Sequence, residues 1–437
     1  MRISVIGCGY LGAVHAASMA KLGHEVIGID VDERKISELQ AGRAPFFEPG
    51  LPELLTEVQE TGRLSFSTNM ADAEGARVHF VCVGTPQRKG ENAADLTYVD
   101  AAFNELFPYL NEGDIAVGKS TVPVGTAARL ADLAADKAPG AVLAWNPEFL
   151  REGHAVKDTL TPDRFVYGIP AGPAGEAATA ALDEVYATPL ADGTPRLVVD
   201  YATAELVKTA ANSFLATKIS FINAMAEVCE ATGADVTALA DAIGMDERIG
   251  RKFLNAGVGF GGGCLPKDIR AFMARAGELG ADQALTFLRE VDAINMRRRT
   301  RVVELTRELC SGSLIGKRIT VLGAAFKPES DDVRDSPALS VAAQLQLQGA
   351  TVTVTDPEAL ANAKVRFPEL AYEPETKTAL ARAHALVLLT EWKEYRELDP
   401  AAVGNLVDDK NILDGRNVLN PTAWRDAGWH YKGIGRQ

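Results

Sequence analysis

The sequence predicts an α/β protein with two doubly wound domains joined by a long central helix in a helical dimerisation domain. Three observations support this fold. Short β-branched runs alternate with helical stretches near both ends of the chain, a glycine turn follows the first strand of each end, and residues 202–232 lack glycine and proline. Alternating strands and helices of this kind form a parallel sheet covered by helices on both faces.

The first part of the chain contains the strands of one predicted domain, at residues 1–198. We expect strands at residues 3–6, 25–29, 78–83, 115–119, 142–145 and 197–200. The apolar positions of residues 202–232 then recur at helical spacing. A helix of that length is longer than a small domain is wide, so it predicts a connection between domains and a face for self-association. This helix belongs to a predicted middle domain at residues 199–300.

A second α/β pattern begins at Lys317, where a strand runs into a glycine turn. Further strands are expected at residues 350–356, 385–390 and 411–414. The predicted third domain therefore covers residues 301–437.

Composition excludes several classes of partner. The 437 residues carry a net charge of −14, which argues against nucleic acid and anionic lipid, because both need a broad cationic face. We expect no membrane span, since no apolar run approaches the ~20 residues that cross a bilayer. The five cysteines show no metal-type pairing, so we expect no metal site, and free thiols in a reducing cytoplasm are the simplest interpretation.

The glycine motif GCGYLG occupies residues 7–12, between the first strand and a helix. Such glycines allow a tight turn and a close approach of the backbone to a diphosphate at the helix N-terminus. Asp30 ends the next strand, where a carboxylate can accept a hydrogen bond from a ribose hydroxyl. This order predicts a Rossmann-like domain that binds NAD, although Arg34 and Lys35 leave NADP open. A purely structural glycine turn is the alternative.

Later strands of this domain end in polar residues at the carboxyl edge of the sheet, where ligands bind. One strand is followed by Thr85, in the segment Gly84-Thr85-Pro86, and the next by Thr121, in the segment Ser120-Thr121-Val122-Pro123. The segment NPEFLREG at residues 146–153 then places Glu148 and Glu152 four residues apart. The threonines could also belong to ordinary turns, and the two glutamates could also mark the solvated start of a helix. On the central helix, Glu205, Lys208 and Asn212 share one face, which a solvated stripe would also explain.

The strongest signal for chemistry is the loop GVGFGGGCLPKD at residues 257–268. It delivers Cys264 to a predicted helix N-terminus beside a lysine, a setting that lowers a thiol pKa and favours the nucleophilic thiolate. The other four cysteines fall on strands or apolar helix faces, where they serve as small core residues. We therefore expect Cys264 to be a nucleophile.

Together these motifs resemble the UDP-glucose/GDP-mannose dehydrogenase family. The resemblance covers the whole chain and includes GFGGGCLPKD at residues 259–268 and GAAFKPESDDVR at residues 323–334. It implies oxidation of the C6 alcohol of a nucleotide sugar to a carboxylate with two NAD⁺. In that chemistry Cys264 captures the aldehyde as a thiohemiacetal, which becomes a thioester that water opens.

The resemblance also implies roles for individual residues. The catalytic set is Cys264, Lys208, Asn212, Asp268, Thr121 and Glu148. The NAD-binding set is Gly7, Gly9, Tyr10, Leu11, Gly12, Asp30, Lys35, Thr85, Thr121, Glu152, Lys267 and Arg334. The substrate-binding set is Glu148, Phe149, Leu150, Arg151, Glu152, Lys208, Asn212, Arg248, Phe253, Leu254, Gly257, Gly259, Phe260, Gly261, Lys327 and Arg416. Arg248 is implied to reach the site of a neighbouring subunit in a homodimer.

The substrate implied by the resemblance is UDP-glucose, and the product is UDP-glucuronate. The loop reads VGFGG, unlike the longer GFAFGG form associated with GDP-mannose enzymes. GDP-mannose or another nucleotide sugar remains an alternative. A two-electron 3-hydroxyacid dehydrogenase would need neither Cys264 nor the second α/β pattern. A protein that senses NAD and a nucleotide sugar without turnover would need no complete set of acid, base and thiol.

Overall fold

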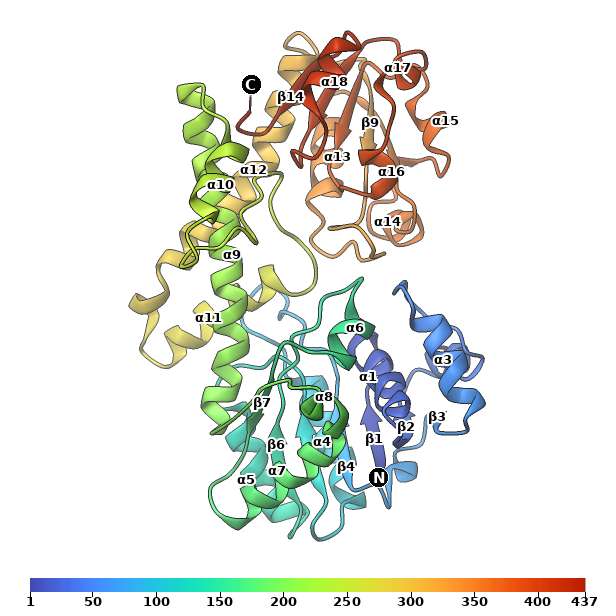
Figure 1. Cartoon of the computed structure of the whole chain (residues 1–437), viewed down its shortest axis with the longest axis vertical. Helices are drawn as coiled ribbons and strands as arrows, with labels where there is room; N and C mark the ends of the chain where they lie inside the picture. The colour runs from blue at the N-terminus through green and yellow to red at the C-terminus, as the bar shows by residue number, and fades with distance from the viewer. Residues whose placement is uncertain (437) are drawn as a thin grey trace. The chain divides into compact units, whose positions relative to one another are not determined.

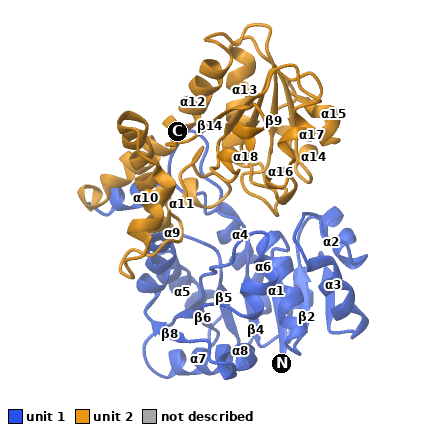
Figure 2. Ribbon diagram, turned by 45° about the horizontal axis from the view of Figure 1, so that its top comes forward, with its two compact units in different colours: residues 1–211, 270–280 blue, residues 212–269, 281–437 orange. Residues whose placement is uncertain are grey.

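A computed structural model describes residues 1–436 as two compact units (Figure 2). Unit 1 contains residues 1–211 and 270–280, and unit 2 contains residues 212–269 and the chain from residue 281 onward. Two of the three boundaries fall inside helices, α9 (Tyr201–Thr232) and α11 (Leu265–Glu278), and the third follows α11. Each of these helices therefore contributes side chains to both units.

Unit 1 is built on an eight-stranded sheet with the order β3-β2-β1-β4-β5-β6-β7-β8 (Figure 1). Its strands are β1 (Arg2–Ile6), β2 (Glu25–Ile29), β3 (Leu64–Ser67), β4 (Val78–Val81), β5 (Ile115–Gly118), β6 (Val142–Trp145), β7 (Phe165–Gly168) and β8 (Arg196–Val199). Neighbouring strands are parallel except β6 and β7, which pair antiparallel. The carboxyl ends of β1 to β6 therefore meet at one edge.

Helices cover both faces of this sheet. They are α1 (Tyr10–Lys21), α2 (Glu33–Gln40), α3 (Leu51–Glu60), α4 (Thr97–Leu106), α5 (Thr126–Lys137), α6 (Ala155–Leu160), α7 (Pro173–Val185) and α8 (Ala187–Ala191), with short 3₁₀ turns at Met70–Ala73 and Phe107–Tyr109. Successive strand residues face opposite sides. On β5, Ile115 and Val117 join the core beneath α1, α3 and α7, and Ala116 joins the core beneath α4 and α5.

Unit 2 contains a six-stranded parallel sheet with the order β11-β10-β9-β12-β13-β14. Its strands are β9 (Arg318–Leu322), β10 (Thr351–Thr355), β11 (Ala371–Tyr372), β12 (Ala385–Leu388), β13 (Asn411–Asp414) and β14 (His430–Gly433). Its further helices are α10 (Val236–Gly244), α12 (Phe287–Leu309), α13 (Pro337–Leu347), α14 (Leu360–Arg366), α15 (Thr376–Leu380), α16 (Lys393–Arg396), α17 (Pro400–Val403) and α18 (Pro421–Asp426), with a 3₁₀ turn at Asp282–Leu285. One continuous core joins this sheet to the unit 2 part of α9.

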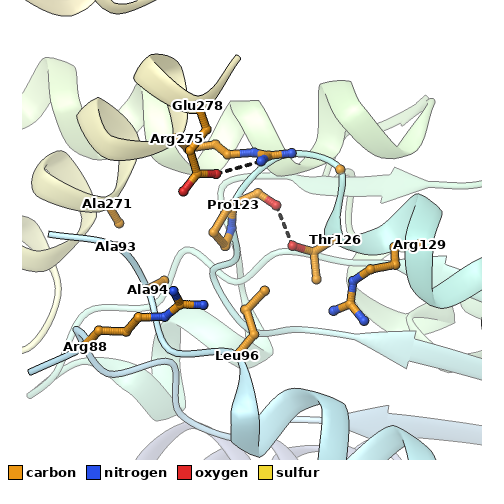
Figure 3. Close-up of a pocket in the computed structure, with 11 residues that line it drawn as sticks. Arg88, Ala93, Ala94, Leu96, Pro123, Thr126, Arg129, Ala271, Arg275 and Glu278 are labelled. Carbon is orange, nitrogen blue, oxygen red and sulfur yellow. Dashed lines mark hydrogen bonds and ion pairs between the residues drawn. The ribbon is translucent and has the colours of Figure 1, made fainter. Parts of the chain in front are cut away.

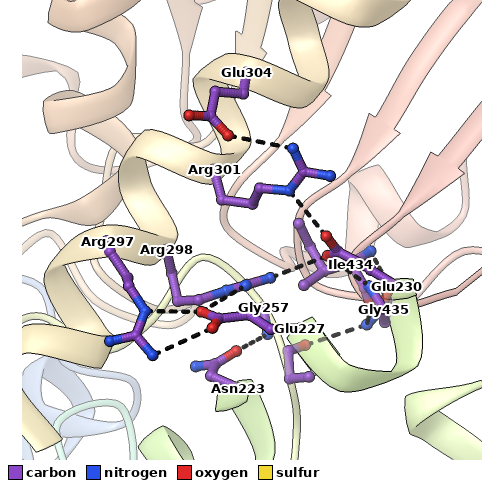
Figure 4. A network of polar contacts seen from close by, with 12 residues as sticks. Asn223, Glu227, Glu230, Gly257, Arg297, Arg298, Arg301, Glu304, Ile434 and Gly435 are labelled. Carbon is purple, nitrogen blue, oxygen red and sulfur yellow. Dashed lines mark hydrogen bonds and ion pairs between the residues drawn. The ribbon is translucent and has the colours of Figure 1, made fainter. Parts of the chain in front are cut away.

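A network of arginines and carboxylates holds α9 against α12 in unit 2 (Figure 4). Arg298 is fully buried, and its guanidinium lies 3.3 Å from a Glu227 oxygen and 3.4 Å from a Glu230 oxygen. Glu230 also accepts from the Gly435 backbone, 3.2 Å away. The same carboxylate thus binds the buried arginine and the segment that follows β14.

The predicted fold class is confirmed: two Rossmann-like sheets are present, together with a long central helix. Strands β3, β7, β11 and β14 were not expected from the sequence. The division into domains at residues 1–198, 199–300 and 301–437 stays a prediction. No helix described for residues 1–436 combines the length and the apolar character of a membrane span.

Candidate active site

The glycine motif of unit 1 forms a tight turn between β1 and α1. Gly7 has a φ of +88°, and a Cβ on Gly12 would lie 1.8 Å from the Gly7 carbonyl oxygen. By contrast, a Cβ on Gly9 would meet no atom within 4 Å. No side chain caps the N-terminus of α1 at Gly9. The motif thus leaves open space beside a helix N-terminus that no side chain caps, the arrangement that a diphosphate fits.

Asp30 lies at the carboxyl end of β2, as the sequence predicted. Its buried carboxylate accepts hydrogen bonds from Cys8 N at 2.8 Å and Asp32 N at 3.0 Å. Lys35 Nζ lies 2.8 Å from the same carboxylate. The structure therefore brings Asp30 and Lys35 together beside the glycine turn, where the adenosine half of a dinucleotide binds in sheets of this type.

Tyr10 and Leu11 face the protein rather than the open side of the turn. The Tyr10 hydroxyl donates to Glu48 and accepts from Gly153 N at 3.0 Å. The buried Glu48 also accepts from Gly153 N at 2.6 Å and Ala155 N at 2.7 Å. Leu11 packs against the core beneath α1. The start of α1 is thereby tied to the segment that follows Glu148 and Glu152.

The loop between β5 and α5 carries Thr121, and three side chains anchor it. Thr85 Oγ1 donates to the Thr121 carbonyl at 2.7 Å. The buried carboxylate of Glu205, on α9, accepts from Gly125 N and Ala127 N, each at 2.7 Å. Arg275 donates to Val124 O at 2.9 Å from the unit 1 part of α11. Predicted residues Thr85 and Thr121 are therefore brought together.

A cavity of about 200 Å³ is lined in part by this loop (Figure 3). Its lining includes Arg88, Pro123, Arg129, Arg275 and Glu278. Arg129 is paired with Asp100, and Arg275 is paired with Glu278. Because these charges are balanced locally, we assign no ligand to the cavity.

Glu148 and Lys208 form a nearly buried ion pair in unit 1. Lys208 Nζ lies 3.1 Å from Glu148 Oε1, and Glu148 Oε2 accepts from Leu150 N at 2.8 Å. The ammonium group also lies 5.5 Å from the centre of the Phe149 ring. A carboxylate and an amine at this distance can exchange protons with a bound reactant or water.

The remaining residues of this segment have different surroundings. Arg151 makes a two-point contact with Asp158, with distances of 2.8 and 2.7 Å. Its guanidinium is therefore committed to a neighbouring side chain. Glu152 is half-buried.

Cys264 is the exposed cysteine of the described chain and immediately precedes α11. The other four cysteines are buried, and burial raises the pKa of each, to about 12 for Cys82. Those four thiols are poor nucleophiles because the thiolate is the reactive form. A lowered pKa at Cys264 stays a prediction.

The glycines before Cys264 pack closely in unit 2. A Cβ on Gly261 would lie 2.3 Å from the Asp335 carbonyl oxygen, and one on Gly262 would lie 2.8 Å from the Phe326 ring. A Cβ on Gly263 would lie 2.3 Å from the Arg334 guanidinium carbon. The loop can follow this path only with glycine at the first two positions, because backbone and ring atoms leave no room for a side chain.

Asn212 and Asp268 meet in unit 2, although 56 residues separate them in sequence. Asn212 Nδ2 donates to Asp268 Oδ2 at 2.7 Å, and both side chains are buried. Lys267 Nζ binds the other carboxylate oxygen of Asp268. The first turn of α11 thus places a buried, hydrogen-bonded carboxylate four residues after Cys264.

Arg416, a predicted nucleotide-sugar residue of unit 2, binds the backbone of the glycine loop. Arg416 donates to three backbone carbonyls, Leu389 O at 2.7 Å, Gly259 O at 3.1 Å and Phe326 O at 3.2 Å. It therefore joins three loops at the carboxyl edge of the sheet. Gly257 N donates to Asn223 Oδ1 at 2.9 Å, which anchors the loop to α9 (Figure 4).

The other predicted residues of unit 2 fall into two groups. Leu254 and Phe260 are buried, Phe253 has a φ of +66°, and Lys327 Nζ lies 5.4 Å from the Phe326 ring centre. Arg248 and Arg334 are exposed and bind Asp246 and Asp332 of the same chain.

Comparison with known proteins identifies the chain. Three domain models of the UDP-glucose/GDP-mannose dehydrogenase family match the chain. The model of the NAD binding domain matches residues 1–189, that of the central domain residues 202–297, and that of the UDP binding domain residues 320–421. The chain belongs to this family. It is accordingly an oxidoreductase that binds NAD in unit 1.

Relatives match this family member along its whole length. A UDP-glucose 6-dehydrogenase of Rhizobium meliloti strain 1021 is 40% identical over 100% of both chains. UDP-glucose 6-dehydrogenase TuaD of Bacillus subtilis strain 168 is 40% identical over 100% of this chain and 93% of its own length. The solved structure of a UDP-glucose dehydrogenase from Pyrobaculum islandicum has a TM-score of 0.89 and 38% identity, covering 100% of this chain and 98% of its own.

Some well-placed residues of this dehydrogenase were missed by sequence reasoning. Glu48 had no motif to mark it, and Lys119 was assigned only to a strand. Lys119 is buried and donates to Asn146 at 3.0 Å, two residues before Glu148. The only signal for Lys119 was a charged residue at the end of an apolar strand.

Proposed function

We propose that the protein oxidises UDP-glucose to UDP-glucuronate, with two NAD⁺ consumed per sugar. The observation that carries this proposal is the full-length match to UDP-glucose 6-dehydrogenases, combined with an exposed Cys264 next to a buried Asn212–Asp268 pair. A family enzyme that formed only an aldehyde would have no use for a nucleophile there.

The residues present fit NAD. The open side of Gly9 and the uncapped start of α1 would hold the diphosphate, and Asp30 with Lys35 would border the adenosine ribose. NAD⁺ bound there supplies the acceptor for hydride. Gly7 and Gly12 shape the turn, and Tyr10 and Leu11 orient it through the protein interior. Thr85, Thr121, Glu152, Lys267 and Arg334 complete the proposed cofactor-binding set.

Cys264 accounts for the second oxidation. Its sulfur adds to the C6 aldehyde, forming a carbon–sulfur bond, and the carbonyl oxygen takes a proton to give the thiohemiacetal. Loss of hydride from that carbon and of the hydroxyl proton leaves a thioester on Cys264. Water then adds to the thioester carbon and expels the Cys264 thiolate, so that the carboxylate is released.

Proton transfers fall to the buried polar groups. Lys208 and Asp268 would handle proton transfer and the developing oxyanion through a bound water that Thr121 helps to hold, and Asn212 would be a further donor. Glu148 would take a proton from the water that opens the thioester. The Lys208 ammonium, 3.1 Å from Glu148, holds that carboxylate in place for this step.

The nucleotide sugar would be bound by the glycine loop of unit 2 and by the segment after β6 in unit 1. The proposed contacts of unit 2 are Phe253, Leu254, Gly257, Gly259, Phe260, Gly261, Lys327 and Arg416, and those of unit 1 are Phe149, Leu150 and Arg151. Arg416 and Lys327 would supply positive charge to the diphosphate, which would reconcile an acidic protein with an anionic substrate.

We also propose a cytoplasmic homodimer. Phe214, Phe221 and Val228 recur every seven residues on α9 and are 66%, 49% and 52% exposed, which supports burial against a second copy. Arg248 is exposed and would reach the neighbouring site. Sedimentation of the F214D/F221D variant as a monomer would support this interface. Unchanged affinity for UDP-glucose in Arg248→Ala would exclude a shared site.

The test is a panel of UDP- and GDP-sugars with NAD⁺ or NADP⁺, read by absorbance of the reduced nicotinamide. We expect two NADH per UDP-glucose and no free aldehyde. One NADH per sugar would refute the thioester route, preference for GDP-mannose would change the substrate, and binding without turnover would indicate a sensor. Cys264→Ala should abolish acid formation while NADH binding, followed by fluorescence, stays intact.

A further inference from the structure

Lys119 is a buried lysine for which the proposed mechanism has no use. It directly follows β5, and its backbone N–H donates to Val81 O at 3.0 Å, so the strand ladder continues through it. Its Nζ lies 3.0 Å from Asn146 Oδ1 and 3.4 Å from the Tyr186 hydroxyl. The rings of Phe80 and Tyr186 lie 5.7 and 5.9 Å from the same nitrogen.

Burying the Lys119 ammonium among these neighbours costs free energy. An amide, a phenol and two aromatic rings contact the ammonium group, and none of them carries an opposite charge at neutral pH. Burial lowers the pKa of Lys119 to about 8 for this reason. An uncharged side chain of similar length would fill the space without the desolvation penalty. We therefore look for the role of Lys119 in the groups that its ammonium hydrogen-bonds and in those that its charge affects.

The donors reach the loop that carries Glu148. Asn146 is buried, and its side chain accepts from Lys119 and from Tyr186, the latter at 2.7 Å, while its Nδ2 donates to Val166 O at 3.0 Å. Pro147 restricts the backbone between Asn146 and Glu148. Holding the Asn146 side chain therefore limits the directions from which Glu148 can approach Lys208.

The charge reaches the same pair. Glu148 raises the pKa of Lys119 and Lys208 lowers it, and such interactions are reciprocal. The charge of Lys119 is therefore coupled to the pair in which Glu148 acts. The other titratable groups that face Lys119 are Cys82 on the strand side, His15 on α1 and Tyr186 before α8.

We infer that Lys119 is a positioning residue for the Glu148–Lys208 pair, acting through Asn146 from beneath the loop. The inference rests on the proposed function, because it assigns Lys119 to the step in which Glu148 activates water. Loss of Lys119 should then slow opening of the thioester more than the steps before it.

The experiment compares Lys119→Met with Glu148→Gln, the wild type and Lys157→Met, an exposed lysine of α6 that serves as the matched control. Each enzyme is mixed with UDP-glucose and NAD⁺, quenched in acid, and analysed by intact-protein mass spectrometry for a sugar nucleotide attached to Cys264. We expect the adduct in Lys119→Met and Glu148→Gln, and turnover of Lys119→Met lowered by about tenfold or more, the scale on which misplaced catalytic groups act.

The outcomes separate this inference from the function that it rests on. Adduct in Glu148→Gln without adduct in Lys119→Met would overturn the role of Lys119 alone. No adduct in either variant would overturn the assignment of Glu148 and this inference with it. If circular dichroism shows that Lys119→Met is unfolded, Asn146→Ala takes its place in the experiment. It removes the link between Lys119 and the loop but keeps the buried lysine, so it should also accumulate adduct.

A pH series provides a readout that a merely structural role would not move. Below about pH 8 Lys119 is charged, and above it the side chain is a neutral amine. The ratio of wild-type to Lys119→Met turnover should therefore fall as pH rises from 7 to 9. A ratio that is constant over this range, with equal NADH binding by both proteins, would contradict an electrostatic role.

Discussion

Glu205→Ala should loosen the loop that carries Thr121 without unfolding the protein. The Glu205 carboxylate accepts from Gly125 N and Ala127 N at 2.7 Å each, and these amides begin α5. Alanine leaves both donors without their acceptor. The loop would then keep the side-chain bonds of Thr85 and Arg275 and that of Ser120, whose hydroxyl donates to Val83 O at 2.6 Å.

The size of the effect follows from two hydrogen bonds to one buried carboxylate. The net contribution of a hydrogen bond, after desolvation, is ~1 kcal/mol, so the two bonds contribute ~2 kcal/mol. Burial raises the pKa of Glu205 from 4.5 to about 6, although the bonds from Ala127 and Gly125 lower it. A loss of ~2 kcal/mol predicts amide exchange about 30-fold faster at Gly125 and Ala127.

Hydrogen exchange resolved by mass spectrometry on peptides covering residues 120–130 measures this opening directly. Glu53→Ala, an exposed glutamate on α3 of the same unit, is the matched control and should exchange like the wild type. Unchanged exchange in Glu205→Ala would refute the reasoning. Faster exchange over the whole of unit 1 would also refute it, because that result indicates global destabilisation instead of a local release.

Three further predictions concern stability and binding. The stability of the wild type relative to Lys119→Met should rise by ~2 kcal/mol from pH 7.5 to 9.5 in urea unfolding, because the unfolded lysine holds its proton in that range and the folded one loses it near pH 8. A free-energy difference between the two proteins that falls as pH rises would contradict this prediction. Arg298→Met should lose ~2 kcal/mol, more than the partly exposed Arg297→Met, because Glu227 and Glu230 lose a buried partner and keep only Arg297 and Arg301. Equal losses would exclude a special role for burial. Arg416→Ala should weaken UDP binding in calorimetry, and Arg416→Lys should not restore it, because an ammonium cannot reach three carbonyls.

The parts of the fold that sequence predicted are those with a strong local signal. The glycine turn, the helix at residues 202–232 and the strands of both parallel cores each occupy one continuous stretch. Strand β7, at Phe165–Gly168, was missed because it is short and pairs with β6 in the opposite direction. An antiparallel strand at that place breaks the alternation on which the prediction depended.

The site divides in the same way. Cys264 lies in a loop whose composition alone indicates reactivity, and its exposure agrees with that use. Glu48 could not be found from sequence, because its bonds to Gly153 and Ala155 span 105 and 107 residues. The burial of Lys119 likewise depends on rings from β4 and from the end of α7. Side chains that act through partners distant in sequence leave no local pattern.

Because Cys264 is exposed and the other four cysteines are buried, oxidation can inactivate the protein without unfolding it. Peroxide in solution meets Cys264 first, and the four thiols in the cores are shielded from it. A stored preparation can therefore lose turnover while its circular dichroism and melting curve stay the same. Only an assay of activity, or a count of reactive thiols before and after reduction, reports whether such a sample is intact.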